Sequence, residues 1–190
     1  MGWLNARPMR LTIKALQVQP EDAVLELGFG SGHGIAALAR LATRGQVIGV
    51  DHSRAMLAQA ARRNRTAMAQ GRVRLRLCPF DQTLLPDASV NKVLAVNVAY
   101  FFHEDGREIR EAWRVLKPGG RMALYVTHRN SMRHWKFASG GSHHLHDEAS
   151  LEALLLRGGF SGKHVDIQRV RIARGIDGLL AVVGKPAEDT

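Results

Sequence analysis

VLELGFGSGHG, residues 24–34, and VIGVD, residues 47–51, are the two stretches of sequence that decide the fold. An apolar run ends at a glycine-rich turn, an apolar periodic stretch follows, and a second apolar run ends in a single carboxylate, Asp51. This order predicts a strand, a loop, a helix and a second strand. Glycines let the backbone approach a ligand closely, and an acid at the end of the second strand accepts hydrogen bonds from ribose hydroxyls. The two stretches therefore predict a site for a cofactor that contains a nucleoside.

The spacing of the glycines distinguishes between two kinds of cofactor. A dinucleotide site needs Gly-x-Gly-x-x-Gly, with the pyrophosphate at the helix N-terminus. Here Gly28, Gly30 and Gly32 alternate, and His33 stands where the third glycine of that motif would fall. Glu26 precedes the loop, where a carboxylate gives a pyrophosphate little but forms a charge-assisted hydrogen bond with an amino group. S-adenosylmethionine has a sulfonium and an ammonium group and no phosphate, so the loop predicts this cofactor rather than a nicotinamide dinucleotide.

Residues 26–32, ELGFGSG, resemble the first motif of the class I (Rossmann-like) S-adenosylmethionine-dependent methyltransferases. Three further segments are similar to later motifs of that family: residues 51–57, 81–90 and 114–121. The four motifs follow one another in the family's order from about Val24 to Val126. The resemblance implies an α/β fold with a doubly wound, mostly parallel seven-stranded sheet whose last strand is antiparallel. It also implies methyl transfer from S-adenosylmethionine, with S-adenosylhomocysteine as the product.

The resemblance further implies which residues hold the cofactor. Asp51 is the expected ribose acceptor, Asp81 the expected partner of the adenine amino group, and Met56 the expected apolar contact of adenine. Glu26 is expected to bind the cofactor's ammonium group or to orient the loop. The other expected cofactor residues are Gly28, Gly30, Gly32, His52, Gln82 (mainly through its backbone amide) and Asn97 (at the amino acid end of the cofactor). The side chains among them also have structural alternatives: an acid that caps its own loop or helix, a core methionine, a solvated loop acid, or a turn residue.

Methyl transfer needs a nucleophile in line with the methyl carbon, and positioning and desolvation can supply most of the rate. No catalytic side chain is therefore obligatory. His103 and His128 are the leading candidates for a base that deprotonates the acceptor, because imidazole titrates near neutral pH. Tyr100 is a candidate lining residue on the substrate side. Val98 and Ala99 stand where enzymes that methylate planar amides often carry two prolines, which disfavours those acceptors.

The stretch HHLHD, residues 143–147, invites interpretation as a zinc site. Adjacent histidines point apart on most backbones, and structural zinc sites favour cysteine pairs, whereas this chain has one cysteine, Cys78. No metal is therefore predicted. The stretch SGGS, residues 139–142, is typical of a hinge, so residues 127–146 are interpreted as a substrate-side lid or, equally well, as a plain loop.

The pattern of apolar residues predicts the order of the other elements. A helical segment in residues 1–20 precedes strands at residues 24–27, 47–50, 73–77, 92–96, 122–126, 165–172 and 179–183. Helices are predicted at residues 31–42, after the cap Ser53, from Asp105 to Leu116, and from Asp147 to the glycines at 158 and 159. The first of these helices is expected to bury Ile35, Leu38 and Leu41, and Pro118-Gly119-Gly120 is expected to end the third. The strand at residues 73–77 alternates between apolar residues and arginines, which is typical of a sheet edge.

Length and composition limit the class of protein. At 190 residues and 45% apolar content, residues 1–190 are expected to form a single domain. One cysteine allows no intramolecular disulfide and favours a reducing cytoplasm. The sequence contains no uninterrupted apolar stretch of about 18 residues, and residues 1–10 do not resemble a signal peptide, so neither a membrane span nor secretion is expected.

The charge is unusual: the net charge is +10 and the isoelectric point is about 10.8. No acid occurs between Asp51 and Asp81, nor between Glu111 and Asp147, while both stretches are rich in arginine. A basic surface attracts nucleic acid, anionic lipid or acidic small molecules. The alternative is a coat of surface arginines without a partner, because scattered surface charge has little energetic meaning.

Together these observations predict a methyltransferase that acts on a small-molecule acceptor. An RNA acceptor and an anionic phospholipid headgroup remain alternatives because of the charge. A non-catalytic module that binds the cofactor is a third alternative, from a different functional class. The sequence does not identify the acceptor atom, the oligomeric state or the role of the basic surface.

Overall fold

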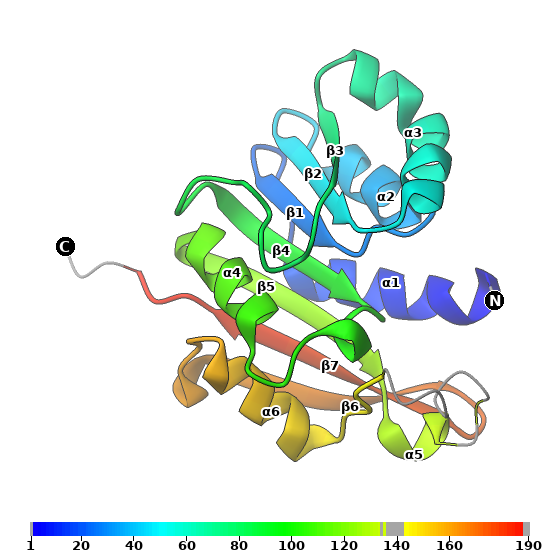
Figure 1. Cartoon of the computed structure of the whole chain (residues 1–190), viewed down its shortest axis with the longest axis vertical. Helices are drawn as coiled ribbons and strands as arrows, with labels where there is room; N and C mark the ends of the chain where they lie inside the picture. The colour runs from blue at the N-terminus through cyan, green and yellow to red at the C-terminus, as the bar shows by residue number, and fades with distance from the viewer. Residues whose placement is uncertain (1, 134, 136–142, 188–190) are drawn as a thin grey trace.

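A seven-stranded sheet with the order β3-β2-β1-β4-β5-β7-β6 forms the centre of the computed structural model, which describes residues 2–133, 135 and 143–187 (Figure 1). The strands are β1 (Ala23–Leu27), β2 (Gln46–Asp51), β3 (Val73–Leu77), β4 (Val90–Val96), β5 (Leu116–Thr127), β6 (Val165–Ala173) and β7 (Ile176–Gly184). Strand β7 runs antiparallel to both of its neighbours, and the pairs from β3 to β5 are parallel. The predicted doubly wound sheet and its antiparallel last strand are confirmed.

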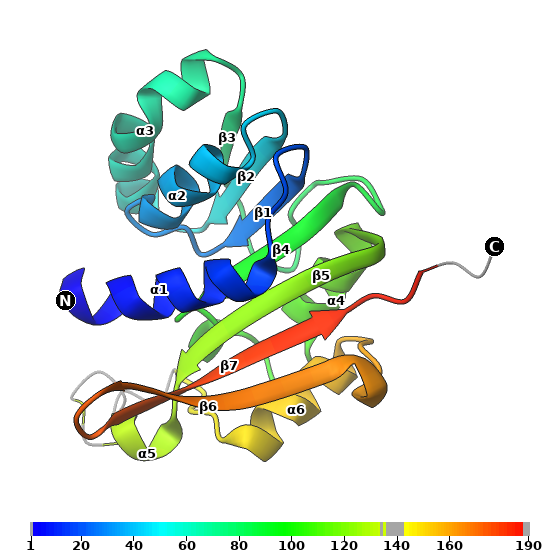
Figure 2. The same cartoon turned by 180° about the vertical axis from the view of Figure 1, so that it is seen from behind.

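Helices cover both faces of this sheet. One face carries α1 (Gly2–Leu16), α2 (His33–Leu41) and α3 (Arg54–Ala69), and the other carries α4 (Arg107–Val115) and α6 (Glu148–Arg157) (Figures 1 and 2). Short turns of helix are η1 (Ala99–Phe101), α5 (Arg129–Met132) and η3 (Gly162–His164). None of the helices in the described residues is both long and apolar enough to cross a lipid bilayer.

Strand β4 shows why the central strands are almost continuously apolar. Val93 and Ala95 belong to the core under α4 and α6, whereas Leu94 and Val96 belong to the core under α1, α2 and α3. A strand that is buried on both faces has no position for a solvated side chain. Strand β3 lies at one edge of the sheet, as its alternating pattern predicted, and exposes Arg74.

The boundary between α4 and β5 differs from the prediction. Helix α4 ends at Val115, and β5 already begins at Leu116, which pairs with Val90 before the register shifts. The Pro-Gly-Gly turn at residues 118–120 therefore lies inside β5 and does not end the helix. The backbone amide of Ser89 donates to Val115 O at 2.8 Å, so pairing with the preceding strand competes with another helical turn.

Two smaller predictions about helices are also corrected. The N-cap of α4 is Gly106, in a left-handed conformation, while Asp105 accepts a hydrogen bond from the amide of Arg107 at 2.9 Å. Leu41 is 42% exposed, and the neighbouring Ala42 is buried in its place, because α2 ends at Leu41 and the chain turns inward there. The predicted caps Ser53 and Asp147 are confirmed. The predicted hinge at residues 139–142, and His134, lie outside the described residues.

Candidate active site

The loops that follow β1 and β2 are joined by one carboxylate at the edge where the parallel strands end. The amide of Gly30 donates to Asp51 Oδ2 at 2.9 Å, and the amide of Ser53 donates to Asp51 Oδ1 at 2.9 Å. The amide of Gly28 donates to Val50 O at 2.8 Å. Asp51 is only 6% exposed, yet each carboxylate oxygen has accepted a single hydrogen bond and keeps acceptor capacity. Asp51 can therefore hold the loop and accept from ribose hydroxyls at the same time.

The three predicted glycines all lie in the left-handed region of backbone conformation, with φ of 71° at Gly28, 52° at Gly30 and 82° at Gly32. A Cβ atom added at Gly30 would meet no described atom within 4 Å. The loop thus presents Gly30 to open space beside Asp51, where a ligand can approach the backbone closely. Gly32 is the N-cap of α2.

Glu26 lies beneath this loop and not at its mouth. Its side chain is 1% exposed and packs on Gly34, where a Cβ atom would come within 2.0 Å of Glu26 Oε1. Burial, and then the charge of Asp51, raise the pKa of Glu26, while a backbone hydrogen bond from Ile35 lowers it. Oε2 has no hydrogen-bond partner among the described residues. A cationic ligand above the loop fits this buried acid, because positive charge favours its ionised form. The close approach of Gly34 was not anticipated from the motif.

Aromatic and apolar side chains surround the start of α3, next to Asp51. The ring of His52 lies 5.2 Å from the ring of Phe80 and 6.3 Å from that of Phe101, in edge-to-face geometry. Met56 is half-buried in the first turn of α3, and its amide donates to Ser53 Oγ at 3.3 Å. Phe101 is 49% exposed and was not predicted. These side chains adjoin Asp51 and offer apolar and aromatic surface at the start of α3.

The loop after β3 is held on α4 by a buried acid that the motifs did not indicate. Glu111 Oε1 accepts from Thr83 N at 2.9 Å and from Thr83 Oγ1 at 2.6 Å. Asp81 is half-buried, and Gln82 is exposed. The amide of Gln82 donates to Pro79 O at 3.3 Å, so its predicted backbone contact with the cofactor competes with a turn.

Asn97 and Tyr100 form a brace between the ends of β4 and β5. Asn97 has a φ of 55°, and its Oδ1 accepts from the Tyr100 hydroxyl at 3.0 Å. That hydroxyl accepts in turn from the amide of Thr127 at 2.5 Å. Burial raises the pKa of Tyr100, so the phenol stays neutral. The structure thus brings Asn97 and Tyr100 together and ties both to β5.

The two candidate bases lie on different elements. His103 is exposed in the loop before α4, with Nδ1 at 3.2 Å from Asp105 Oδ2. His128 is buried and is the N-cap of α5: its Nδ1 accepts from the amide of Asn130 at 3.1 Å. Nε2 must therefore carry the hydrogen, and it lies 3.2 Å from Glu148 Oε2. Both nitrogens of His128 are engaged.

The histidines of the 143–147 stretch have separate partners. The ring of His143 lies 4.9 Å from that of Phe101, His144 pairs with Glu104 at 3.2 Å, and His146 lies beside Ala99 O. In the part of the chain that the structure describes, no group of three or more histidine, cysteine or acidic residues is placed to hold a metal ion.

Comparison with known proteins adds independent findings. A family model described as a methyltransferase domain matches residues 24–120. An uncharacterised methyltransferase of Bacillus subtilis, YdaC, is 32% identical over 120 residues, which cover 63% of this chain and 64% of that protein. The arsenite methyltransferase of Halobacterium salinarum is 35% identical over 106 residues, which cover 55% of this chain and 27% of that protein. The chain thus spans less than two thirds of the length of either relative.

Solved structures share the fold at low sequence identity. The [4+2]-cyclase SpnF has a TM-score of 0.77 at 19% identity, over 95% of this chain and 81% of that one. YcgJ of Bacillus subtilis has a TM-score of 0.74 at 19% identity, over 95% and 98%. The geranyl diphosphate C-methyltransferase of Streptomyces coelicolor, crystallised with S-adenosylhomocysteine, has a TM-score of 0.76 at 17% identity, over 95% and 79%.

Proposed function

This chain belongs to the class I S-adenosylmethionine-dependent methyltransferase family, and we propose that it transfers a methyl group from S-adenosylmethionine to a small-molecule acceptor. The observation that carries the proposal is the double role of Asp51, which anchors Gly30 and keeps acceptor capacity for ribose. A dinucleotide would bring its phosphates close to the Asp51 carboxylate and the buried acid Glu26, whereas a sulfonium and an ammonium group suit this site because positive charge favours the ionised form of Glu26. The cofactor contacts predicted at His52, Met56, Asp81, Gln82 and Asn97 form part of this proposal.

Calorimetry tests the cofactor assignment directly. S-adenosylhomocysteine is expected to bind, and NAD is expected to give no heat of binding at the same concentration. Binding of NAD in preference to S-adenosylhomocysteine would overturn the proposal. Turnover is tested separately, by the release of S-adenosylhomocysteine in the presence of a panel of small acceptors.

The bound cofactor supplies an electrophilic methyl group on sulfur. Asp51 would accept from the ribose hydroxyls and Gly30 would let the backbone approach the nucleoside, while Asn97 and Tyr100 tie the end of β4 to β5. Fixing the reacting groups in line and excluding water lowers the barrier without a catalytic side chain. A base is needed only when the acceptor atom carries a proton at neutral pH that must be removed before or during methyl transfer.

His103 and His128 remain the proposed bases for such an acceptor. His128 can accept a proton only when Nδ1 releases the amide of Asn130 or Nε2 passes its hydrogen to Glu148. His128→Asn retains a good N-cap side chain and removes the imidazole. If either histidine is the base, its substitution lowers kcat by about 100-fold or more and removes one limb of the pH profile. If kcat has the same pH profile in His103→Gln, in His128→Asn and in the unmodified protein, neither histidine is the base.

The small-molecule acceptor is supported by the segment that joins β5 to α6. The segment between β5 and α6, residues 128–147, is short, and its described parts form α5 and an extended stretch that packs on η1. Neither part forms a separate folded unit that would hold a macromolecule. The names of two comparison proteins, the arsenite and geranyl diphosphate methyltransferases, also point to small acceptors.

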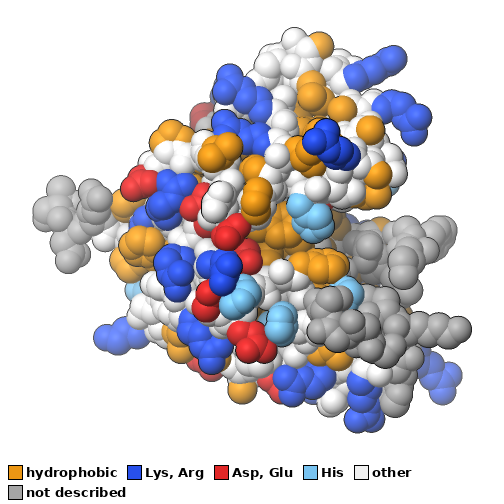
Figure 3. Space-filling model, viewed as in Figure 1, with side chains coloured by type: hydrophobic (Ala, Val, Ile, Leu, Met, Phe, Trp, Pro, Cys, Tyr) orange, Lys and Arg blue, Asp and Glu red, His pale blue; other side chains and the backbone are white. Residues whose placement is uncertain are grey.

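The basic surface favours the alternative acceptors, RNA or an anionic phospholipid headgroup. Figure 3 shows Lys and Arg side chains, without acids between them, around the part of the molecule that α3 forms at the upper right, whereas both signs alternate over α4. The exposed arginines on α3 are Arg54, Arg62, Arg63 and Arg65. Salt-dependent binding of tRNA would favour the first alternative, and flotation with anionic but not neutral liposomes would favour the second.

A non-catalytic or differently catalytic role is the third alternative. The structural neighbour SpnF is a [4+2]-cyclase, so the fold by itself does not fix the reaction. Binding of S-adenosylhomocysteine without methyl transfer to any acceptor of a broad panel would favour this alternative.

A further inference from the structure

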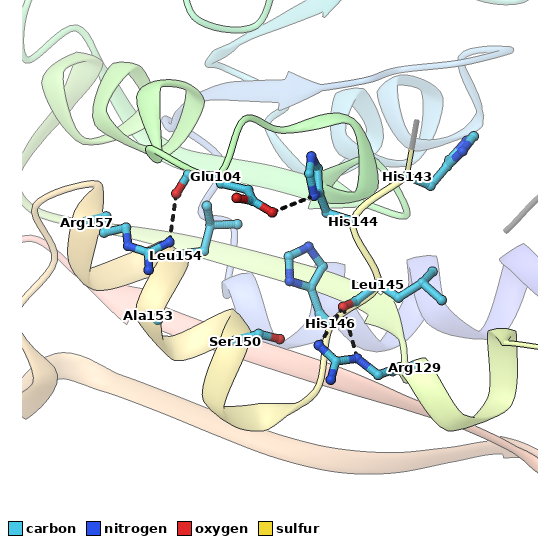
Figure 4. A pocket seen from close by; sticks show the side chains of 10 residues that line it. All are labelled: Glu104, Arg129, His143, His144, Leu145, His146, Ser150, Ala153, Leu154 and Arg157. Carbon is cyan, nitrogen blue, oxygen red and sulfur yellow. Dashed lines mark hydrogen bonds and ion pairs between the residues drawn. The ribbon is translucent and has the colours of Figure 1, made fainter. Parts of the chain in front are cut away.

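A cavity of about 470 Å³ lies between α6, the loop before α4 and residues 143–146 (Figure 4). Two hydrogen bonds hold the lining residues His144 and His146 on η1: His146 Nε2 lies 3.3 Å from Ala99 O, and the amide of His144 donates to Tyr100 O at 2.9 Å. None of the residues that line it belongs to the loops after β1, β2 or β3. Its volume is in the range of small-molecule sites.

His146 lines this cavity and carries a buried acceptor without a donor. A carbonyl oxygen only accepts, so Nε2 must carry the hydrogen that faces Ala99 O, and Nδ1 keeps its lone pair. Nδ1 is buried and has no hydrogen-bond partner among the described residues, and the residue as a whole is 5% exposed. Burial lowers the pKa of His146, which keeps the ring neutral. In Figure 4 the ring faces α6 across the cavity. A buried acceptor of this kind is stabilised by a ligand that donates a hydrogen bond.

Arg157 contributes a cation from the last turn of α6. Its Nη1 donates to the backbone oxygen of Glu104 at 2.8 Å, and no carboxylate in the described ranges pairs with it. Arg129, by contrast, pairs with Asp147 at 2.8 Å. Guanidinium groups bind carboxylates through two parallel hydrogen bonds, so Arg157 is the lining residue suited to an anion. Leu154 supplies an apolar wall between Arg157 and His146 (Figure 4).

We propose that this cavity binds a small carboxylate that also carries a hydroxyl or amino group. The carboxylate pairs with Arg157, the O–H or N–H group donates to His146 Nδ1, and the apolar part of the ligand packs on Leu154. None of the lining residues is among the predicted cofactor contacts, so this proposal does not depend on the proposed methyl transfer.

Four probes with the same ring test the proposal by calorimetry. Mandelate has both a carboxylate and a hydroxyl group, phenylacetate lacks the hydroxyl, benzyl alcohol lacks the carboxylate, and phenylglycine has an amino group in place of the hydroxyl. Mandelate or phenylglycine is expected to bind about tenfold or more tightly than phenylacetate, because only they satisfy the buried nitrogen. A preference for mandelate identifies a hydroxy acid, and a preference for phenylglycine an amino acid. Equal binding of all three acids, or binding of none, would overturn the proposal.

Two variants locate the binding site. His146→Gln keeps a donor for Ala99 O and removes the Nδ1 acceptor, so the advantage of mandelate over phenylacetate is expected to disappear. Arg157→Gln is expected to weaken all three acids about tenfold or more and to leave benzyl alcohol unchanged. His164→Gln and Arg62→Gln, at exposed positions outside the cavity, are the matched controls. Unchanged binding in both cavity variants would contradict the assignment.

A spectroscopic readout covers the case in which His146→Gln does not fold. Nitrogen-15 spectra of the unmodified protein are expected to show an unprotonated Nδ1 on His146, whose resonance shifts with mandelate or phenylglycine and not with phenylacetate. A protonated Nδ1, or a resonance that none of the acids moves, would overturn the proposal.

Discussion

The edge of the sheet at which the parallel strands end has two halves, and different hydrogen-bonding groups hold each half together. The β1–β2 half consists of Gly28–Gly32 and Asp51–Ser53, where backbone amides converge on one carboxylate. The β4–β5 half consists of Asn97–Phe101 and Thr127–Asn130, where side chains of Asn97, Tyr100 and His128 brace neighbouring segments. In the first half the partners of the single carboxylate are backbone amides of a glycine-rich loop and of the next turn, so a motif can specify the arrangement. In the second half the partners are side chains and amides that no motif specifies.

The strongest test of this contrast is Asp51→Ala. The substitution removes the anchors of Gly30 and Ser53 as well as the proposed ribose acceptor. Affinity for S-adenosylhomocysteine in calorimetry is expected to fall about 100-fold or more, because hydrogen bonds to charged groups are each worth about 1.5–3 kcal/mol. Asp166→Ala, at an exposed acid on β6, is the control. Unchanged affinity in Asp51→Ala would remove the basis of the cofactor assignment.

Gly34→Ala tests how Glu26 packs beneath the glycine loop of the β1–β2 half. The new methyl group would lie 2.0 Å from Glu26 Oε1, so the acid or α2 must move. We expect a loss of about 1–3 kcal/mol in the free energy of unfolding, measured with urea, as for other overpacked sites. Gly162→Ala, whose methyl group meets only Leu156 at 3.9 Å, is expected to change stability by less than about 0.5 kcal/mol. Equal effects of the two substitutions would show that Glu26 does not pack as described.

Tyr100→Phe addresses the β4–β5 half. It leaves the buried amide of Thr127 without its acceptor and Asn97 Oδ1 without its donor, which is expected to cost about 1–2 kcal/mol in urea unfolding. Asn97→Gly accommodates the positive φ and removes only the Asn97 side chain. If the brace acts as a unit, the double variant is destabilised by less than the sum of the two single variants. Strict additivity would argue against the brace.

Glu26→Gln gives the smallest expected effect, and its sign depends on pH. Because the pKa of Glu26 is raised in the folded state, the protonated acid is favoured there, and stability is lost as pH rises through the folded-state pKa. Glutamine does not ionise, so the variant is expected to be more stable than the unmodified protein near neutral pH.

This difference should narrow as the solution becomes acidic and Glu26 is protonated in both folded and unfolded states. Urea unfolding across a pH series measures it. A stability difference that does not change with pH would show that Glu26 titrates normally.

Prediction from sequence succeeded where the structure of a segment depends on the spacing of its own apolar residues or on a residue that caps a helix. The alternation in β3 identified an edge strand, and the capping residues Ser53 and Asp147 begin their helices as expected. It failed at the end of α4, where pairing of residues 89 and 90 with 115 and 116 decides between helix and strand. It also missed Glu111, because its role depends on a loop that lies close only in the folded chain.

The sequence by itself determined the strand–loop–helix–strand unit, the class of cofactor and the position of Asp51, since glycine spacing and strand ends follow from neighbouring residues. Only the tertiary structure decided that Glu26 lies under the loop, that both nitrogens of His128 are engaged, and that His146 offers a buried lone pair. Burial and hydrogen-bond partners come from segments brought together by packing of the sheet and its helices, and the order of residues along the chain does not specify them.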